Sequence, residues 1–137
     1  TQTMAEVLSK LGSEHVMVVH GEDGMDEISI SSPTRVTELK NKSMTTYMIK
    51  PTDLGFDMAN LETIQVENVD ASKAMMLDVL NGNKGPHRDI TLLNAGAAIY
   101  VSGLTSTLKE GIEKAASVID QGLSLKKLEA LKVASHG

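Results

Sequence analysis

The sequence predicts an α/β unit with a small sheet in its first half and helices in its second half. Three observations support this prediction. An apolar run at residues 16–19 lies between an amphipathic segment and a loop, as a buried strand does. Two extended segments flank the turn residues 40–43. From residue 70 onward, apolar residues recur at the three- and four-residue spacing of helices.

The length, charge and cysteine content narrow the class of protein. A chain of 137 residues fits one domain with its own core. The formal net charge of −5 disfavours nonspecific binding to nucleic acid or to an anionic membrane. No apolar run reaches the roughly 20 residues that span a bilayer, and the absence of Cys excludes disulfides and thiolate metal sites. We therefore expect a cytoplasmic protein with no nucleic-acid partner and no membrane partner.

The first predicted elements are a helix and a strand. Met4, Val7, Leu8 and Leu11 form one apolar helical stripe. The apolar run at residues 16–19 is typical of a strand that is covered on both faces, as in a parallel sheet. Because a helix opens the chain before any strand, we expect residues 1–137 to be a single α/β unit taken from a longer protein.

Extended segments follow the first loop. Ile28 and Ile30 alternate with serines, which predicts a strand, and Pro33 interrupts it. Residues 35–39 and 44–49 then predict a hairpin around the turn at residues 40–43. Further along, residues 63–66 are a candidate for one more strand.

The second half of the chain is predicted to form four helices. Each has a residue that favours a helix start, and a glycine follows each of the first three. These start and stop residues are Asp70 with Gly82, Pro86 with Gly103, Thr105 with Gly122, and Ser124 for the last helix.

Several residues that could bind a ligand have simpler structural interpretations. His15 and His20 are five residues apart on a strand, so they point to opposite faces and cannot hold one metal ion. Asn94 stands alone on an apolar helical face and is interpreted as a hydrogen-bonded core amide. The G-x-x-G pattern at residues 82–85 fits a helix end and a turn better than a nucleic-acid clamp. Arg88 is interpreted as part of a solvated helix start.

The acidic loop is the strongest candidate site. Glu22, Asp23, Asp26 and Glu27 repel one another, and a loop that only had to turn would not need four carboxylates. The loop follows the carboxyl end of a predicted strand, where open α/β sheets place their ligands. Carboxylates offer the hard oxygen ligands that Mg²⁺ takes, although the spacing is not that of an EF-hand. A metal site and a merely solvated loop both remain open from spacing alone.

Beyond these patterns, the sequence resembles a known family over nearly its whole length. Residues 16–39, VMVVHGEDGMDEISISSPTRVTEL, are similar to the strand, acidic loop and following strands of the anthranilate phosphoribosyltransferases. The similarity continues through GPHRDITLLNAGAAIYVSG at residues 85–103 and IDQGLSLKKLEAL at residues 119–131. One departure is QVENVD at residues 65–70, where the family usually has a glycine pair before the helix.

The resemblance implies a fold and a reaction. The fold is the C-terminal part of the anthranilate phosphoribosyltransferase or pyrimidine nucleoside phosphorylase-like α/β domain, with a mixed sheet, a β-hairpin and a helical C-terminal half. The reaction transfers the phosphoribosyl group of phosphoribosyl pyrophosphate to anthranilate in tryptophan biosynthesis and releases pyrophosphate. The family's Mg²⁺-binding acid pair corresponds to Asp26 and Glu27. The resemblance carries no such role over to Glu22 and Asp23, so we interpret them as supporting negative potential or as simply exposed.

The resemblance also implies what the chain does not contain. The family's glycine-rich phosphate loop, its Lys-His-Gly-Asn stretch and its anthranilate-contacting Arg correspond to positions before Thr1. We therefore expect the 137-residue chain alone to be inactive, and the intact enzyme to be a homodimer. Two alternatives are an enzyme like the pyrimidine nucleoside phosphorylases and a noncatalytic module that binds Mg²⁺ or another subunit.

Overall fold

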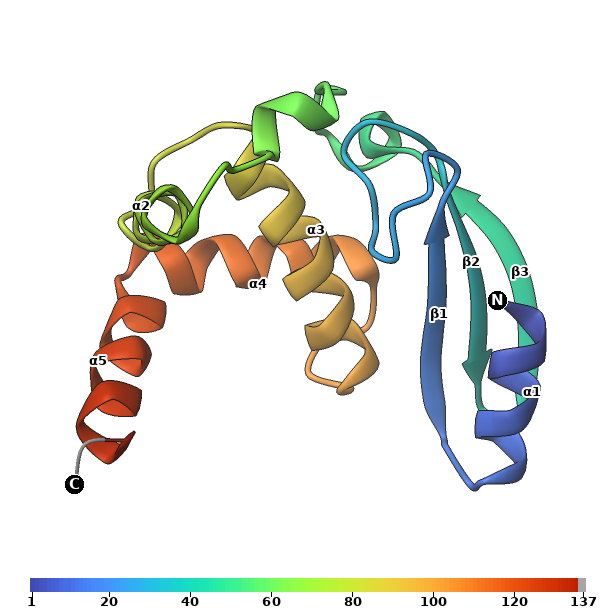
Figure 1. Cartoon of the computed structure of the whole chain (residues 1–137). Coiled ribbons are helices and arrows are strands. Elements are labelled where there is room, and N and C mark those ends of the chain that lie inside the picture. Colours follow the sequence, from blue (N-terminus) through green and yellow to red (C-terminus); the bar gives the residue numbers. More distant parts are fainter. Residues whose placement is uncertain (136–137) are drawn as a thin grey trace.

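The computed structural model describes residues 1–135, which form a small sheet followed by a group of helices (Figure 1). In chain order the elements are α1 (Gln2–Lys10), β1 (His15–Gly21), β2 (Thr34–Lys40), β3 (Ser43–Ile49), the 3₁₀ helices η1 (Pro51–Leu54) and η2 (Leu61–Ile64), α2 (Val69–Leu80), α3 (Pro86–Val101), α4 (Leu108–Asp120) and α5 (Leu123–Ser135). The predicted α/β class, the hairpin and the helical second half are all confirmed.

The sheet has the order β1-β2-β3, and both pairs of neighbouring strands are antiparallel. The expectation of a parallel β1 in a mixed sheet is therefore wrong for the part of the chain that the structure describes. In β1, Val19 lies opposite Val36 of β2, on the face that contacts α3. The opposite face of the sheet meets α1, where the Thr37 hydroxyl donates to Thr1 Oγ1 at 2.7 Å. The apolar run is therefore explained by helices that cover both faces of β1. Such cover does not determine whether the strand is parallel or antiparallel to its neighbour.

The β2–β3 hairpin closes through a two-residue turn at Asn41 and Lys42. Both residues have positive φ angles, 52° and 64°. This combination is that of a type I′ turn, whose twist matches the twist of the two strands. The sequence located the turn correctly because the extended runs on either side bound it closely.

Two other predicted strands are absent from the described residues. Ile28 and Ile30 are 1% and 0% exposed, but they lie in a loop, where the Ser29 amide donates to the Thr34 hydroxyl instead of to a strand. In place of the candidate strand at residues 63–66, the chain forms the 3₁₀ helix η2, which includes the first two of these residues. The alternation of isoleucine and serine fitted a strand in the first case. In the structure Ser29 is as buried as the two isoleucines, and the backbone bonds to side chains and to the Ala59 amide instead of to a neighbouring strand.

The helix starts differ from the predicted caps by one or two residues. Asn68, and not Asp70, caps α2 and accepts a hydrogen bond from an amide of its first turn. Thr107, and not Thr105, caps α4 in the same way. Ser124 lies inside α5, and its buried hydroxyl is without a hydrogen-bond partner among residues 1–135. At α2 and α4 the predicted cap is wrong because more than one residue that favours a cap lies near the helix start.

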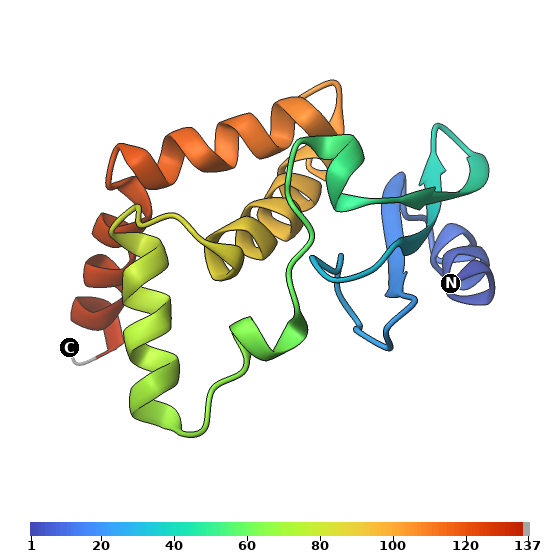
Figure 2. The ribbon, with the colours of Figure 1, turned by 90° about the horizontal axis from the view of Figure 1, so that it is seen from above.

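Helix α3 forms the centre of the molecule. It crosses α4 closely, and Figure 2 shows α2 and α5 on the side of α3 away from the sheet, whereas the start of α4 lies near β3. The main core lies where α3 meets α4, α2 and the acidic loop. Its buried members are Ile28, Ile30, Val79, Ile90, Leu92, Leu93, Ala97, Ile112, Ala115 and Ile119.

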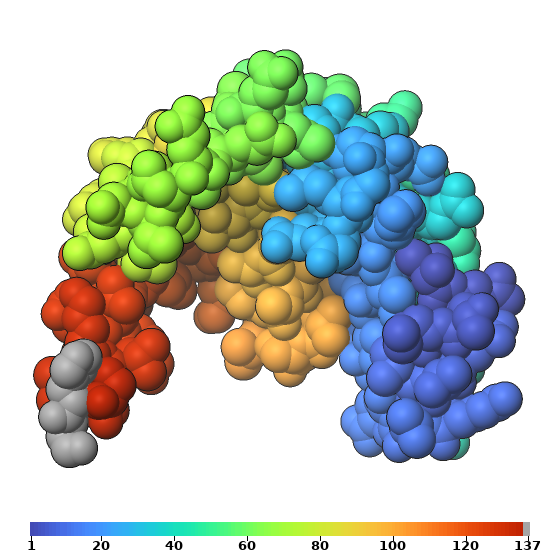
Figure 3. Space-filling model, in the orientation of Figure 1, coloured from blue at the N-terminus to red at the C-terminus, as the bar shows by residue number. Residues whose placement is uncertain are grey.

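The surface has the shape of an arch, with α1 and β1 at one end, α5 at the other and α3 lining the hollow between them (Figure 3). The predicted apolar stripe on α1 faces outward, since Met4, Val7 and Leu11 are 56%, 47% and 77% exposed. None of the helices in residues 1–135 combines the length and hydropathy that a bilayer-spanning segment requires.

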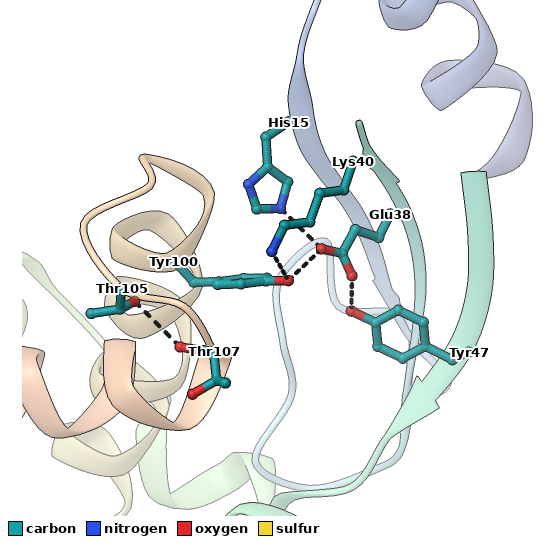
Figure 4. A network of polar contacts seen from close by, with 7 residues as sticks. All are labelled: His15, Glu38, Lys40, Tyr47, Tyr100, Thr105 and Thr107. Carbon is teal, nitrogen blue, oxygen red and sulfur yellow. Dashed lines mark hydrogen bonds and ion pairs between the residues drawn. The ribbon is translucent and has the colours of Figure 1, made fainter. Parts of the chain in front are cut away.

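A buried carboxylate joins the sheet to α3 (Figure 4). Glu38 of β2 accepts hydrogen bonds from the hydroxyls of Tyr47 at 2.8 Å and Tyr100 at 2.7 Å. It also pairs with Nε2 of His15 at 2.9 Å, and Lys40 donates to the Tyr100 oxygen at 3.0 Å. The structural interpretation of His15 is confirmed, and the network fixes α3 relative to all three strands.

Candidate functional site

The acidic loop leaves β1 and returns to β2 over residues 22–33. Its two ends are joined because the Glu22 amide donates to the Pro33 carbonyl at 2.9 Å, and its first half turns back so that the Gly21 amide donates to the Met25 carbonyl at 2.8 Å. A Cβ at Gly21 would lie 2.5 Å from Oδ1 of Asp23 and 3.2 Å from the Cβ atoms of Met25 and Ser29, so a larger residue would displace the Asp23 carboxylate. The acidic loop directly follows β1, as predicted.

Asp23 braces the loop from inside. Its Oδ2 accepts hydrogen bonds from the hydroxyls of Ser29, at 2.5 Å, and Ser31, and its Oδ1 accepts from the Met25 amide at 3.2 Å. Burial by itself would raise the pKa of Asp23, but these hydrogen bonds outweigh it and hold the pKa below its usual value. Asp23 is exposed, as expected. Its carboxylate nevertheless already accepts hydrogen bonds from other residues of the loop.

Glu22 also has a partner within the chain. Its Oε1 accepts from Nη2 of Arg35 at 3.1 Å, and the two side chains are 44% and 52% exposed. Such an exposed ion pair contributes little to stability. It does neutralise one of the four charges of the loop.

Asp26 and Glu27 are the other two acids of the loop. Both are exposed, and in the described part of the chain neither carboxylate takes part in a hydrogen bond or an ion pair. Residues 1–135 contain no group of three or more acidic or histidine side chains that could hold a metal ion. Two adjacent carboxylates with free oxygens fit Mg²⁺, which usually keeps waters and takes its other ligands from a phosphate-bearing substrate. Two of the four acids thus have partners within the chain, and two are available to a ligand.

Glu27 also lines a hollow between the acidic loop and α2. This hollow has a volume of about 390 Å³, and its wall is apolar apart from a few groups. The lining residues are Met25, Glu27, Ile64, Ser72, Met75, Met76, Val79, Leu80, His87, Ile90 and Thr91. At its edge, Nε2 of His87 lies 2.6 Å from Oδ2 of Asp78.

Asn94 of α3 holds the residue that follows the acid pair. Its Oδ1 accepts from the Ile28 amide at 2.9 Å, and its Nδ2 donates to the Ile28 carbonyl, also at 2.9 Å. The prediction of a hydrogen-bonded core amide is confirmed. Its partner was not predictable, because the two residues are 66 positions apart in sequence.

Of two other sequence interpretations, the one for Arg88 is wrong and the one for residues 82–85 agrees with the structure. Arg88 is 5% exposed, so the expectation of a solvated helix start is wrong for this residue. Its Nη1 donates to the Gly82 carbonyl at 2.8 Å, and its Nη2 pairs with Asp120 at 2.7 Å. Arg88 therefore braces the turn at residues 82–85 against α4, in agreement with the structural interpretation of that G-x-x-G pattern.

Comparisons with known proteins agree on one family. Residues 1–125 match the family described as the glycosyl transferase family, a/b domain. The chain is 51% identical, over 133 residues, to the anthranilate phosphoribosyltransferase of Methylobacillus flagellatus, covering 97% of this chain and 39% of that protein.

Solved structures give the same result. The crystal structure of anthranilate phosphoribosyltransferase from Thermus thermophilus matches with a TM-score of 0.83 and 36% identity, over 93% of this chain and 37% of that one. The enzyme from Saccharomyces cerevisiae in complex with PRPP and Mg matches with a TM-score of 0.73 and 26% identity, over 84% and 33%. The chain thus spans less than two fifths of the length of these proteins.

Proposed function

The chain belongs to the glycosyl transferase family whose α/β domain it matches over residues 1–125, and we propose that the protein containing it is an anthranilate phosphoribosyltransferase. Relatives with that name share about half of their residues with this chain. The proposed reaction joins anthranilate to the phosphoribosyl group of phosphoribosyl pyrophosphate. The amine nitrogen bonds to ribose C1, the bond from C1 to the diphosphate oxygen breaks, pyrophosphate leaves with the electron pair, and the amine loses a proton.

One observation supports a site for this reaction in the chain: Asp26 and Glu27 are the two acids of the loop whose carboxylates have no partner in residues 1–135. We propose that they hold Mg²⁺, as the similarity to a Mg-bound yeast enzyme suggests. When bound, Mg²⁺ supplies positive charge that stabilises the diphosphate leaving group. Asp26 and Glu27 would hold that charge after the end of β1, and Asp23 keeps the loop closed behind them.

The experiment is a comparison of variants in the complete enzyme. Asp26→Asn with Glu27→Gln keeps the side-chain size and removes both charges. We expect at least a 100-fold loss in kcat/KM for phosphoribosyl pyrophosphate, about what one lost electrostatic contact to a transition state costs, and a higher Mg²⁺ requirement. Glu22→Gln is the matched control because it removes another exposed charge of the same loop, and we expect its activity to stay within twofold. An unchanged Mg²⁺ dependence in the double variant would remove the proposed site.

The substrates have their own test. Formation of phosphoribosylanthranilate is measured with the complete enzyme, beside phosphate-dependent cleavage of a pyrimidine nucleoside. We expect only the first reaction. Cleavage of the nucleoside instead would favour an enzyme like the pyrimidine nucleoside phosphorylases.

We also propose that residues 1–137 alone do not catalyse the reaction, because catalysis by positioning needs both substrates held at once. Support comes from the share of the relatives that the chain spans, 39%. Turnover by the purified 137-residue chain within tenfold of the complete enzyme, at excess Mg²⁺, would contradict this.

The remaining proposals concern the assembly and the compartment. We propose that the complete enzyme is a cytoplasmic homodimer. The absence of Cys is compatible with a reducing compartment, and the homodimer is what the family resemblance implies. Sedimentation of the complete enzyme over a hundredfold range of concentration tests the dimer, and a monomer throughout would contradict it.

A further inference from the structure

Asn94 connects the central helix to the acidic loop through one peptide residue. Both halves of its side-chain amide bond to Ile28, the oxygen to the amide and the nitrogen to the carbonyl, each at 2.9 Å. The same nitrogen also donates to the Ile90 carbonyl of its own helix at 3.0 Å. Figure 1 shows the loop that follows β1 bending toward α3, where this contact is made.

This contact constrains the acid pair because Ile28 directly follows Glu27. The peptide bond between them is planar, so holding the Ile28 amide also holds the Glu27 carbonyl group and α-carbon. On the other side of the acid pair, the carbonyl of Met25, which directly precedes Asp26, accepts a hydrogen bond from the Gly21 amide at 2.8 Å. Asp26 and Glu27 therefore lie between two anchored residues, although their own side chains are exposed.

The helix that carries Asn94 is itself immobilised. Tyr100, less than two turns further along α3, donates to the buried Glu38 of the sheet at 2.7 Å. A residue on such a rigid element positions a ligand-binding loop more accurately than loop residues can by themselves.

We propose that Asn94 is a positioning residue for the metal-binding acids: it sets the place and direction of Asp26 and Glu27 so that both reach the same cation. This inference rests on the proposed function of that pair. It assigns Asn94 no contact with metal or substrate. A core amide that only fills space would also satisfy its hydrogen bonds, so the test must separate positioning from stability.

The first measurement is hydrogen exchange in the complete enzyme without metal. Asn94→Ala removes both bonds to Ile28, and we expect the Ile28 amide to exchange at least tenfold faster while the amides of β2 change less than twofold. Asn68→Ala is the matched control, because it also removes an asparagine side chain that accepts a backbone hydrogen bond, but at the start of α2. We expect this control to leave the Ile28 amide unchanged.

The second measurement is a titration with Mn²⁺ as a spectroscopic substitute for Mg²⁺, in the presence of inorganic pyrophosphate. We expect Asn94→Ala to weaken Mn²⁺ binding at least tenfold and Asn68→Ala to change it less than twofold. Asn94→Asp is a second variant for the case that Asn94→Ala does not fold. It keeps the acceptor for the Ile28 amide but replaces the donor to the two carbonyls, and we expect a similar loss of Mn²⁺ affinity.

The double variant Asp26→Asn with Glu27→Gln separates the two proposals. If it loses Mn²⁺ binding while Asn94→Ala and Asn94→Asp bind within twofold of wild type, the positioning role is overturned and the metal site stands. If the double variant binds Mn²⁺ normally, the metal site fails, and the positioning role fails with it. Weaker binding in the Asn94 variants together with a normal Asn68→Ala control supports the inference.

Discussion

Tyr100 donates a hydrogen bond to Glu38 at 2.7 Å, across 62 residues of sequence and inside the protein. The same carboxylate also accepts from Tyr47 of β3 and pairs with His15 of β1. One buried acid therefore links three strands to the helix that carries Asn94. The stability of the fold and the placement of the acidic loop both depend on this link.

Glu38→Gln tests the link. The amide keeps the size of the side chain but replaces one acceptor oxygen by a donor group that faces a hydroxyl or His15. We expect a loss of about 1–3 kcal/mol in the free energy of unfolding, the cost of leaving buried polar groups unpaired. Urea denaturation measures it, with Glu113→Gln on the exposed side of α4 as the control. Equal stability of the two variants would show that the network is dispensable.

The pH dependence of stability follows from the same network. Burial alone would raise the pKa of Glu38, but the hydrogen bonds from Tyr100, Tyr47 and His15 outweigh it and lower the pKa below its usual value. Since the folded protein holds the ionised form, this stabilisation is present above the usual carboxyl pKa. It is lost as the pH falls through the lowered value. Thermal unfolding from pH 6 to pH 3 should show a smaller fall in Tm for Glu38→Gln than for wild type.

At alkaline pH the relevant group is Tyr47. Burial, and then the hydrogen bond to Glu38, raise the pKa of this phenol. A raised pKa means that the stabilisation is complete below the usual tyrosine value and is lost as the pH rises through the folded value. Tyr47→Phe should therefore lose less Tm than wild type between pH 9 and pH 11. Parallel curves for the two proteins would contradict the assignment.

Gly111→Ala should strongly destabilise the crossing of α3 and α4. A Cβ at this position would lie 2.3 Å from the Gly96 carbonyl oxygen, which is backbone and cannot turn aside. We expect a loss of about 3 kcal/mol, at the upper end of ordinary overpacking, measured by urea denaturation. Ala98→Ser adds one atom at an exposed position of α3 and serves as the control. A loss below that of the control would mean that the helices move apart freely.

Arg88→Ala should cost more than the removal of its charged partner. The substitution leaves the Gly82 carbonyl without its donor and opens the space of a side chain that is 6% exposed. We expect about 2–4 kcal/mol for Arg88→Ala. We expect less than about 1 kcal/mol for Asp120→Asn, because Asp120 is 58% exposed and its pair is screened by solvent. Equal losses would indicate that the ion pair, and not the bond to Gly82, supports the turn.

Asp23→Asn should destabilise the acidic loop, whereas Glu22→Gln should not. Asp23 accepts hydrogen bonds from two serine hydroxyls and a backbone amide. A hydrogen bond to a charged group contributes about 1.5–3 kcal/mol to stability. Hydrogen exchange at the Met25 amide reports the local loss directly. We expect at least tenfold faster exchange in Asp23→Asn and no change in Glu22→Gln, whose carboxylate pairs with the exposed Arg35 outside the loop. Identical exchange in both variants would remove the bracing role.

The sequence by itself determined the features that depend on neighbours in the chain. The hairpin followed from turn residues between two extended runs, and the helices followed from apolar spacing with capping residues and glycines. Among the four acids of the loop, it was the family resemblance, and not their spacing, that pointed to Asp26 and Glu27 as the proposed pair. Periodicity and turn chemistry are local properties, so they can be read within a window of a dozen residues.

Only the tertiary structure decided the features that join distant segments. The antiparallel direction of β1, the bonds from Asn94 to Ile28 and the burial of Arg88 all depend on partners that sequence spacing does not reveal. The tertiary structure also distinguished the acids of the loop from one another. Asp23 accepts hydrogen bonds within the loop, whereas the carboxylates of Asp26 and Glu27 have no partner within residues 1–135. A polar group is satisfied by whatever lies within about 3 Å of it in space. That neighbour is set by the packing of the whole chain.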